Sequence, residues 1–279
     1  QAKNQVPSSP CPQNRNMAGE EVEGGIGYWV RWQVPVCGVI ILLPSFLAYY
    51  TINNVKERDP LYLHNLWKPQ WRCLHPAWLL LYRIVAFLCL SPMLYEVVAM
   101  DGAFAFYFYT QWTFTLVMVY FAVGTVISAY GCWLTSTNSV FVNGIHVVED
   151  QEDLSSFFYG GKRIHKTIKP QRHSAEEAIQ QLAGFWGYLM QTMYQISAGA
   201  VVLTDIVFWC ILVPLESDAH LGLNVLMGCM HTLNAVFLML DTALNSLPFP
   251  WFRLAYFVQW SCIYIIFQWI LHACGFSWW

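Results

Sequence analysis

The stretch FYFYTQWTFTLVMVYFAVGTVISAY at residues 106–130 contains no Asp, Glu, Lys or Arg, and it decides the class of fold. A helix needs about 20 mostly apolar residues to cross the hydrocarbon core of a bilayer, where no water satisfies bare backbone groups. Five further stretches meet this requirement, at about 33–51, 77–99, 188–213, 221–243 and 252–274. The sequence therefore predicts an all-α fold, a polytopic transmembrane helix bundle with six spans.

Composition supports a membrane protein whose main partners are lipids. Hydrophobic residues make up 57% of the chain and charged residues 11%, and the mean hydropathy is +0.41. Soluble domains carry about 25% charged residues. The nine cysteines are scattered without a Cys-x-x-Cys pair, so we expect them to pack in the bundle. The sequence predicts no metal site and no cofactor, and the net charge of −3 gives no indication of nucleic-acid binding. Protein partners cannot be named from it.

The chain divides into a tail and a bundle. Residues 1–27 are rich in Pro, Ser, Gln and Asn and predict a disordered tail, whereas residues 28–279 form the bundle, with its longest connection at about 134–187. Lys and Arg concentrate in the connections after the first, third and fifth spans, which predicts that these connections are cytosolic. The tail is then lumenal or extracellular, and both the endoplasmic reticulum and the plasma membrane fit this pattern.

Polar residues inside the predicted spans are the candidates for function, because each must find a partner in the bundle or line a wet cavity. In the fifth span His231, Asn234 and Asp241 fall within about 80° of one another at 100° per residue. The fourth span carries a similar stripe of Gln191, Gln195 and Asp205. We expect the two stripes to face each other across the bundle.

Other spans contribute single polar groups. Thr110 opens the third span and His272 closes the sixth. Arg83 and Glu96 lie nearer the two ends of the second span, so their side chains are predicted to reach toward the membrane surface.

Three functions are compatible with these residues. In the leading interpretation the polar groups hold the helices together, and the protein has a structural or interaction role. In the second, Thr110 is a nucleophile and His231 is its general base or orients it, in an enzyme that takes lipid from the bilayer. In the third, Asp205, Asp241 and His231 relay protons or bind an ion, although the chain has no inverted repeat typical of transporters.

Four short strings carry a resemblance to a known family. They are Tyr-Thr-Gln-Trp-Thr-Phe at 109–114, His-Thr-Leu-Asn-Ala-Val from His231 with Asp241 further on, Pro-Phe-Pro-Trp at 248–251, and His-Ala-Cys-Gly from His272. From about Asp59 onward the chain resembles the rolling-stone-like family of multi-pass membrane proteins, in particular its uncharacterised plant branch. The resemblance implies that the full protein is longer and has a seventh helix after Trp279.

A more distant similarity suggests chemistry. The androgen-induced membrane hydrolases, which cleave fatty acid esters of hydroxy fatty acids, use an intramembrane Thr and His. Their Thr corresponds to Thr110, and their His-x-x-His helix aligns with His231 to Asn234. The catalytic His of those enzymes is the second of the pair, where this chain has Asn234, and an amide cannot serve as a general base. His231 lies one turn away on the same face.

Overall fold

The computed structural model describes residues 31–55, 60–71, 73–159, 183–216 and 225–276. Six of the helices in this part of the chain are long and apolar enough to cross a membrane, which confirms the predicted all-α polytopic bundle. The predicted tail at 1–27 lies outside the described residues. Helix boundaries agree with the predicted spans to within a few residues, except that the helix of the third span continues to Tyr159, far beyond its predicted end at 130.

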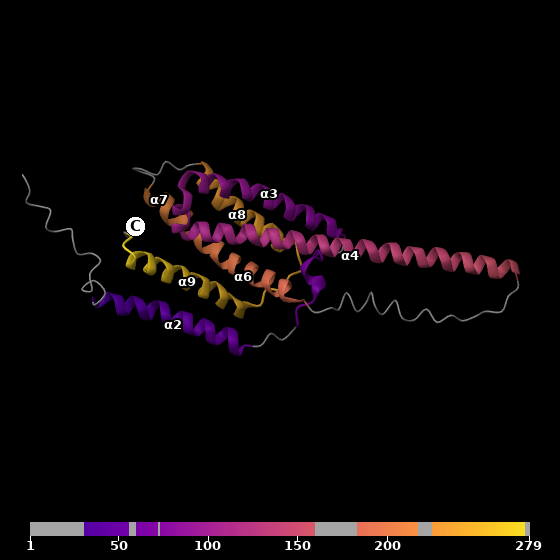
Figure 1. The fold of residues 1–279 in the computed structure, drawn as a ribbon, viewed down its shortest axis with the longest axis horizontal. Helices are drawn as coiled ribbons and strands as arrows, with labels where there is room; N and C mark the ends of the chain where they lie inside the picture. The colour runs from indigo at the N-terminus through magenta and orange to yellow at the C-terminus, as the bar shows by residue number, and fades with distance from the viewer. Residues whose placement is uncertain (1–30, 56–59, 72, 160–182, 217–224, 277–279) are drawn as a thin grey trace, which may run out of the picture.

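The elements alternate in direction along the bundle (Figure 1). In chain order they are α2 (Gln33–Asn54), η1 (Leu63–Leu66), α3 (Pro76–Asp101), η2 (Gly102–Tyr107), α4 (Tyr109–Tyr159), α6 (Phe185–Ile206), the π-helical turn η3 (Val207–Leu212), α7 (Val213–Glu216), α8 (Val225–Leu244), η4 (Trp251–Arg253) and α9 (Leu254–Ala273). We call the end where α4 begins the Thr110 end, and the opposite end, just past α8, the Asn245 end.

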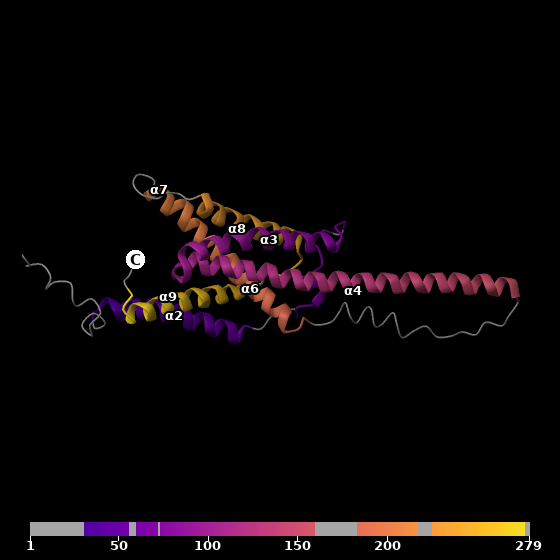
Figure 2. The ribbon, with the colours of Figure 1, turned by 45° about the horizontal axis from the view of Figure 1, so that its top comes forward.

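The spans form three layers of two helices (Figures 1 and 2). Helices α3 and α8 lie on one side, α4 and α6 form the middle, and α9 with α2 lies on the other side. Helix α2 packs mainly on α9, where Ser45 Oγ donates a hydrogen bond of 3.0 Å to Gln259 Oε1. Because α4 and α6 are covered on both sides, the buried polar residues converge around them.

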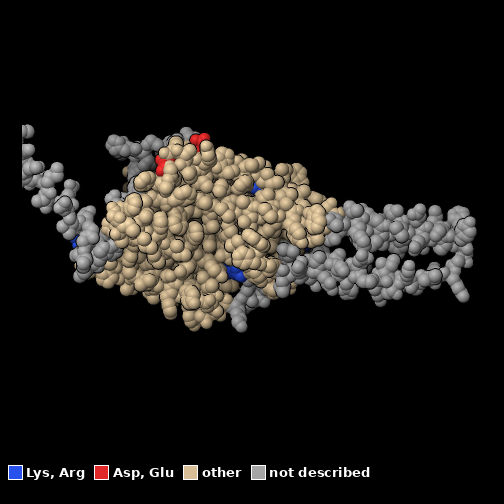
Figure 3. All heavy atoms as spheres, viewed as in Figure 1, with Lys and Arg blue, Asp and Glu red and all other residues tan. Residues whose placement is uncertain are grey.

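The outside of the bundle is apolar, as contact with lipid requires. On the face seen in Figure 3, the described residues include very few Lys, Arg, Asp and Glu. Large hydrophobic side chains such as Leu43, Leu88, Val126 and Met239 are more than half exposed. A surface of this kind lowers its free energy in a bilayer and raises it in water.

Local sequence signals determine where α3 begins and ends. Pro76 occupies the first turn, where its missing N–H is no loss, and His75 Nδ1 caps the helix by accepting from Ala77 N at 3.2 Å. The helix stops at Gly102, whose φ of 60° is accessible mainly to glycine. The chain then makes the 3₁₀ turn η2 and re-enters the bundle at Tyr109, which sets the depth of Thr110.

Helix α4 extends well beyond the bundle (Figure 1). The part suited to the membrane is Tyr109–Ser136, yet the helix continues to Tyr159. The connection predicted at about 134–187 therefore begins as helix, and its remainder up to residue 182 lies outside the described residues.

Candidate functional site

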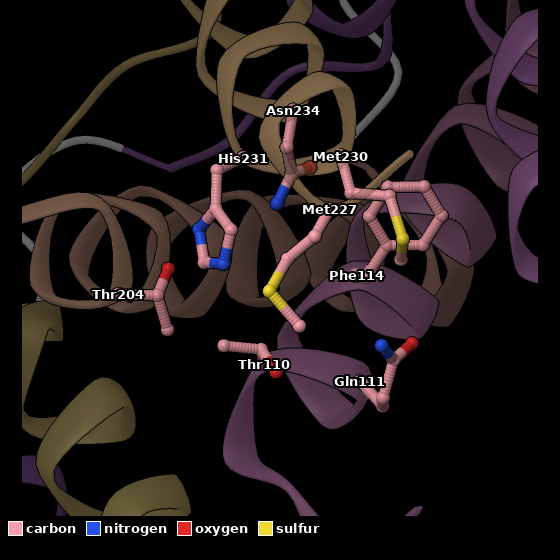
Figure 4. Close-up of a pocket in the computed structure, with 8 residues that line it drawn as sticks. All are labelled: Thr110, Gln111, Phe114, Thr204, Met227, Met230, His231 and Asn234. Atoms are coloured by element: carbon pink, nitrogen blue, oxygen red, sulfur yellow. The ribbon is translucent and has the colours of Figure 1, made fainter. Parts of the chain in front are cut away.

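A small cavity lies at the Thr110 end, between α4, α6 and α8 (Figure 4). Its volume is about 40 Å³, and since one water occupies about 10–15 Å³ by this measure, the cavity has room for a few waters or one small polar group. Helix α4 contributes Thr110, Gln111 and Phe114, helix α6 contributes Thr204, and helix α8 contributes Met227, Met230, His231 and Asn234. Three of the residues predicted as site residues thus line one cavity: Thr110, His231 and Asn234.

Thr110 is held in place by the turn that starts α4. The Trp112 indole donates to the carbonyl of Phe106 at 2.8 Å, and the backbone N–H of Gln111 donates to the carbonyl of Phe108 at 3.2 Å. The Tyr109 hydroxyl is hydrogen-bonded to Ser261 Oγ on α9 at 2.9 Å. These contacts fix the first turn of α4 against its neighbours, so the position of Thr110 at the edge of the cavity is well defined.

His231 is fixed by a hydrogen-bonded carboxylate and by an aromatic ring. Its Nδ1 lies 3.0 Å from Asp205 Oδ1 on α6, and its ring stacks on Phe208 with centroids 4.0 Å apart and planes 8° from parallel. The side chain of His231 is buried, with 8% of the residue exposed. A carboxylate at Nδ1 keeps the proton on that nitrogen and leaves Nε2 as an acceptor. Figure 4 shows the imidazole extending from α8 into the cavity.

The π-helical turn η3 begins two residues after Asp205. Such turns hold one more residue than an α-helical turn and are frequent at functional sites. Here the turn presents Phe208 beneath the His231 ring, so that Asp205 and Phe208 approach the imidazole from its edge and its face. One residue of the predicted fourth-span stripe, Asp205, thus meets one residue of the fifth-span stripe, His231.

Two side-chain amides complete the cavity. Asn234 is 4% exposed, and among the described residues its Oδ1 has no hydrogen-bond partner. Gln111 Oε1 is likewise buried without a partner in that part of the chain. Figure 4 shows the nitrogen of Asn234 pointing into the cavity on the side of His231, and the nitrogen of Gln111 on the side of Met227. Buried amides without partners are costly unless a ligand or water meets them.

A second polar group, the Arg83 cluster, lies toward the Asn245 end and consists of Arg83, Ser128, Tyr120, Asp241 and Asn245. Arg83 Nε donates to Asp241 Oδ1 at 3.0 Å, and both residues are 0% exposed. The Tyr120 hydroxyl and Asn245 Nδ2, the latter at 2.6 Å, donate to Asp241 Oδ2. The prediction that Arg83 reaches toward the membrane surface is therefore wrong.

Arg83 is retained inside the bundle because its remaining donors also find acceptors. Nη1 donates to the carbonyl of Leu66 at 3.0 Å and to Ser128 Oγ at 2.6 Å. The carbonyl of Leu66 belongs to the connection between α2 and α3, which folds back onto the helices. A charge inside a membrane protein is tolerated when it is paired in this way.

The other predicted site residues lie outside the cavity. Gln191 Nε2 donates to the carbonyl of Pro248 at 3.3 Å, Gln195 is fully buried within the bundle on α6, and His272 Nδ1 lies 3.0 Å from the carbonyl of Phe276 at the end of α9. Asp241 is ion-paired with Arg83. Of the site residues predicted from the sequence, some therefore line or adjoin the cavity, and the others lie elsewhere in the bundle.

Sequence reasoning missed several residues. Thr204, Met227 and Met230 line the cavity, and Tyr120 and Asn245 bind Asp241. Asn245 could have been found, because it follows Asp241 by one helical turn. The pairing of Arg83 with Asp241 could also have been considered, because Arg83 lies seven residues inside the second span and Asp241 three residues inside the same end of the fifth.

No protein-family model, curated protein or solved structure matches the chain. Among the described residues, no three His, Cys, Asp or Glu side chains are grouped so that they could hold a metal ion. The six long apolar helices define the class of the protein, a multi-pass integral membrane protein. Its activity has to be inferred from the cavity.

Proposed function

We propose that the protein is an intramembrane hydrolase of lipid esters. Thr110 is the nucleophile, His231 the general base and Asp205 the residue that orients His231. The observation that carries the proposal is the 3.0 Å contact between His231 Nδ1 and Asp205 Oδ1, made at a cavity that Thr110 also lines. A hydroxyl that lines the same cavity as a carboxylate-bound imidazole supplies, together with that pair, the parts of a Ser-His-Asp triad, with Thr in place of Ser.

The reaction proceeds in two steps, acylation of Thr110 and hydrolysis of the acyl-threonine. Thr110 Oγ1 bonds to the ester carbonyl carbon while its proton passes to His231 Nε2, and the alcohol leaves with that proton. Water then attacks the acyl-threonine, again losing a proton to His231, and the fatty acid departs as Thr110 regains its hydrogen. Because Asp205 is bonded to Nδ1, it stabilises the imidazolium that forms in each step.

The depth of the cavity suits a lipid ester. His231 lies five residues into the span that begins at Leu226, which corresponds to about 8 Å at 1.5 Å per residue. Thr110 is the second residue of its span. Ester carbonyls of membrane lipids lie at the border between headgroups and hydrocarbon, which is the level of Thr110 and lies about 8 Å from that of His231. The distribution of Lys and Arg assigns this end to the lumenal or extracellular leaflet.

Access from the lipid phase is supported by Met227. This residue lines the cavity and is 48% exposed on the outside of the bundle. A methionine side chain is flexible and apolar, so an acyl chain can displace it without breaking a hydrogen bond. The neighbouring apolar surface of α8 would receive the rest of the chain.

The two alternatives are supported to different extents. A structural role remains the second candidate, since the Arg83 cluster ties α3, α4 and α8 together without lining the cavity. Transport gains no support, because Asp205 is bonded to His231 and Asp241 to Arg83, in two groups that share no residue.

The test is hydrolysis of a panel of long-chain esters by the purified protein, run together with fluorophosphonate labelling. Thr110→Ala should abolish both turnover and labelling, and His231→Ala should lower turnover by about 10²- to 10⁴-fold. Thr125→Ala and His272→Ala are matched controls, since neither residue lines the cavity, and they should retain activity. Folded wild-type protein that neither turns over esters nor takes up the label would refute the proposal and leave the structural role.

A further inference from the structure

We infer that the side-chain amides of Asn234 and Gln111 bind the carbonyl oxygen of the ester and stabilise the oxyanion that forms when Thr110 attacks. This inference rests on the proposed function. It assigns a role to the two side-chain amides that line the cavity, through their N–H groups. The group of the substrate that these amides recognise is the carbonyl oxygen.

The geometry favours donation toward the cavity. In Figure 4 the Asn234 nitrogen points into the cavity, and its oxygen points away from it. Gln111 follows Thr110 directly in α4, and its amide reaches the same cavity from the opposite side. A carbonyl group held in the cavity beside Thr110 would therefore face N–H groups from two helices, α8 and α4.

The division of labour between His231 and Asn234 explains why an amide belongs at this position. The base has to accept a proton, and the Asp205-bound His231 can do so, whereas an amide cannot. An oxyanion instead requires a donor that keeps its proton, which an amide N–H supplies. The two residues are one turn apart on α8 and both face the cavity, so one helix provides the base and a donor.

Burial makes this donor effective. Asn234 is 4% exposed, so little water competes for its N–H groups. Hydrogen bonds aimed at a developing charge in such a site strengthen in the transition state, and loss of one side-chain amide from an oxyanion site lowers kcat by about 10²- to 10³-fold. Gln111 lies at the less buried wall of the cavity, so its contribution should be smaller.

The experiment measures kcat and KM of the purified protein for p-nitrophenyl palmitate in detergent. The variant Asn234→Leu removes the amide at similar volume, Asn234→Gln keeps an amide, and Gln111→Leu removes the second donor. Gln195→Leu is the matched control, because it removes a buried amide outside the cavity. Thermal unfolding of each variant checks that it folds.

The inference expects Asn234→Leu to lose about 10²- to 10³-fold in kcat with KM nearly unchanged, the pattern of an interaction made only in the transition state. Asn234→Gln should recover part of this loss, Gln111→Leu should lower kcat to a lesser extent, and Gln195→Leu should match wild type. If Asn234→Leu does not fold, Gln111→Leu decides, and unchanged kcat in that variant overturns the inference.

Two negative results are distinguishable. Folded Asn234→Leu with wild-type kcat, beside an inactive Thr110→Ala, would overturn the oxyanion assignment and leave the hydrolase intact. Wild-type protein without turnover or fluorophosphonate labelling would overturn both the hydrolase and the inference.

Discussion

Arg83 Nε and Asp241 Oδ1 lie 3.0 Å apart inside the bundle, although 158 residues separate them in the chain. The contact joins α3 to α8, and Ser128 and Tyr120 add α4 to the same group. Both side chains are fully buried, so neither charge contacts lipid or water. In such a setting, removing either partner leaves an unpaired buried charge, which strongly destabilises the fold.

Removing one member of this pair should therefore destabilise the fold more than removing both. We expect Arg83→Met or Asp241→Leu alone to lower the free energy of unfolding by about 3–5 kcal/mol, because each leaves an unpaired buried charge. The double variant should lose clearly less than the sum of the two. Reversible unfolding in mixed detergent micelles measures all three. Strictly additive losses would show that the two residues act independently.

The role of Asp205 as an orienting residue can be tested without altering its shape. Asp205→Asn keeps the side chain but removes the negative charge that stabilises the His231 imidazolium. We expect kcat to fall by about 10²- to 10⁴-fold while ester binding is retained. Asp101→Asn, a change at the exposed end of α3, is the control. Equal activity of the two variants would remove Asp205 from the mechanism.

Met227 should control access to the cavity. It lies between His231 and Thr110 in the view of Figure 4 and is 48% exposed. Met227→Trp fills the opening with a rigid ring, so fluorophosphonate labelling of Thr110 should become slower, whereas Met227→Ala should make it faster for bulky probes. Met239→Trp, an exposed position further along α8, should leave the rate unchanged. Labelling rates insensitive to Met227 would point to another route.

The contact between α6 and α9 depends on a glycine. A Cβ at Gly199 would lie 2.6 Å from the ring of Phe257, too close for ordinary packing. Gly199→Ala should therefore destabilise the bundle by about 1–3 kcal/mol through overpacking. Adding Phe257→Ala should restore part of this loss, because it removes the opposing ring. Thermal unfolding of the single and double variants measures the recovery, and its absence would show that the ring moves aside freely.

The sequence predicted the six spans because their signal is local. Length and hydropathy alone decide whether a segment such as 106–130 can cross a bilayer. The edges were less certain, since the 3₁₀ turn before Tyr109 and the π-helical turn after Asp205 leave the composition unchanged. Helical periodicity also placed His231, Asn234 and Asp205 on inward faces, and the structure brings all three to the Thr110 end of the bundle.

Which polar residues meet was predictable only in part, because it depends on which helices are neighbours. Asp241 shares a helical face with His231 but lies about 15 Å further along α8, where it meets Arg83. A side chain as long as that of Arg83 could reach either a carboxylate or the membrane surface. The packing of α3 against α8 decides between these, and no single span contains that information.

The Arg83 cluster also has a consequence for biogenesis. Ribosomes add about 5–20 residues per second, so the 158 residues between Arg83 and Asp241 take about 8 to 30 s to appear. During this interval the second span has to enter the membrane before Asp241 is available, at a cost below the roughly 2.5–3.5 kcal/mol of an Arg at the centre of a helix, because Arg83 lies nearer the start of α3. Its long apolar sequence offsets that cost. The contact between α3 and α8 through this ion pair can form only after α8, the fifth span to be translated, has entered the membrane with Asp241.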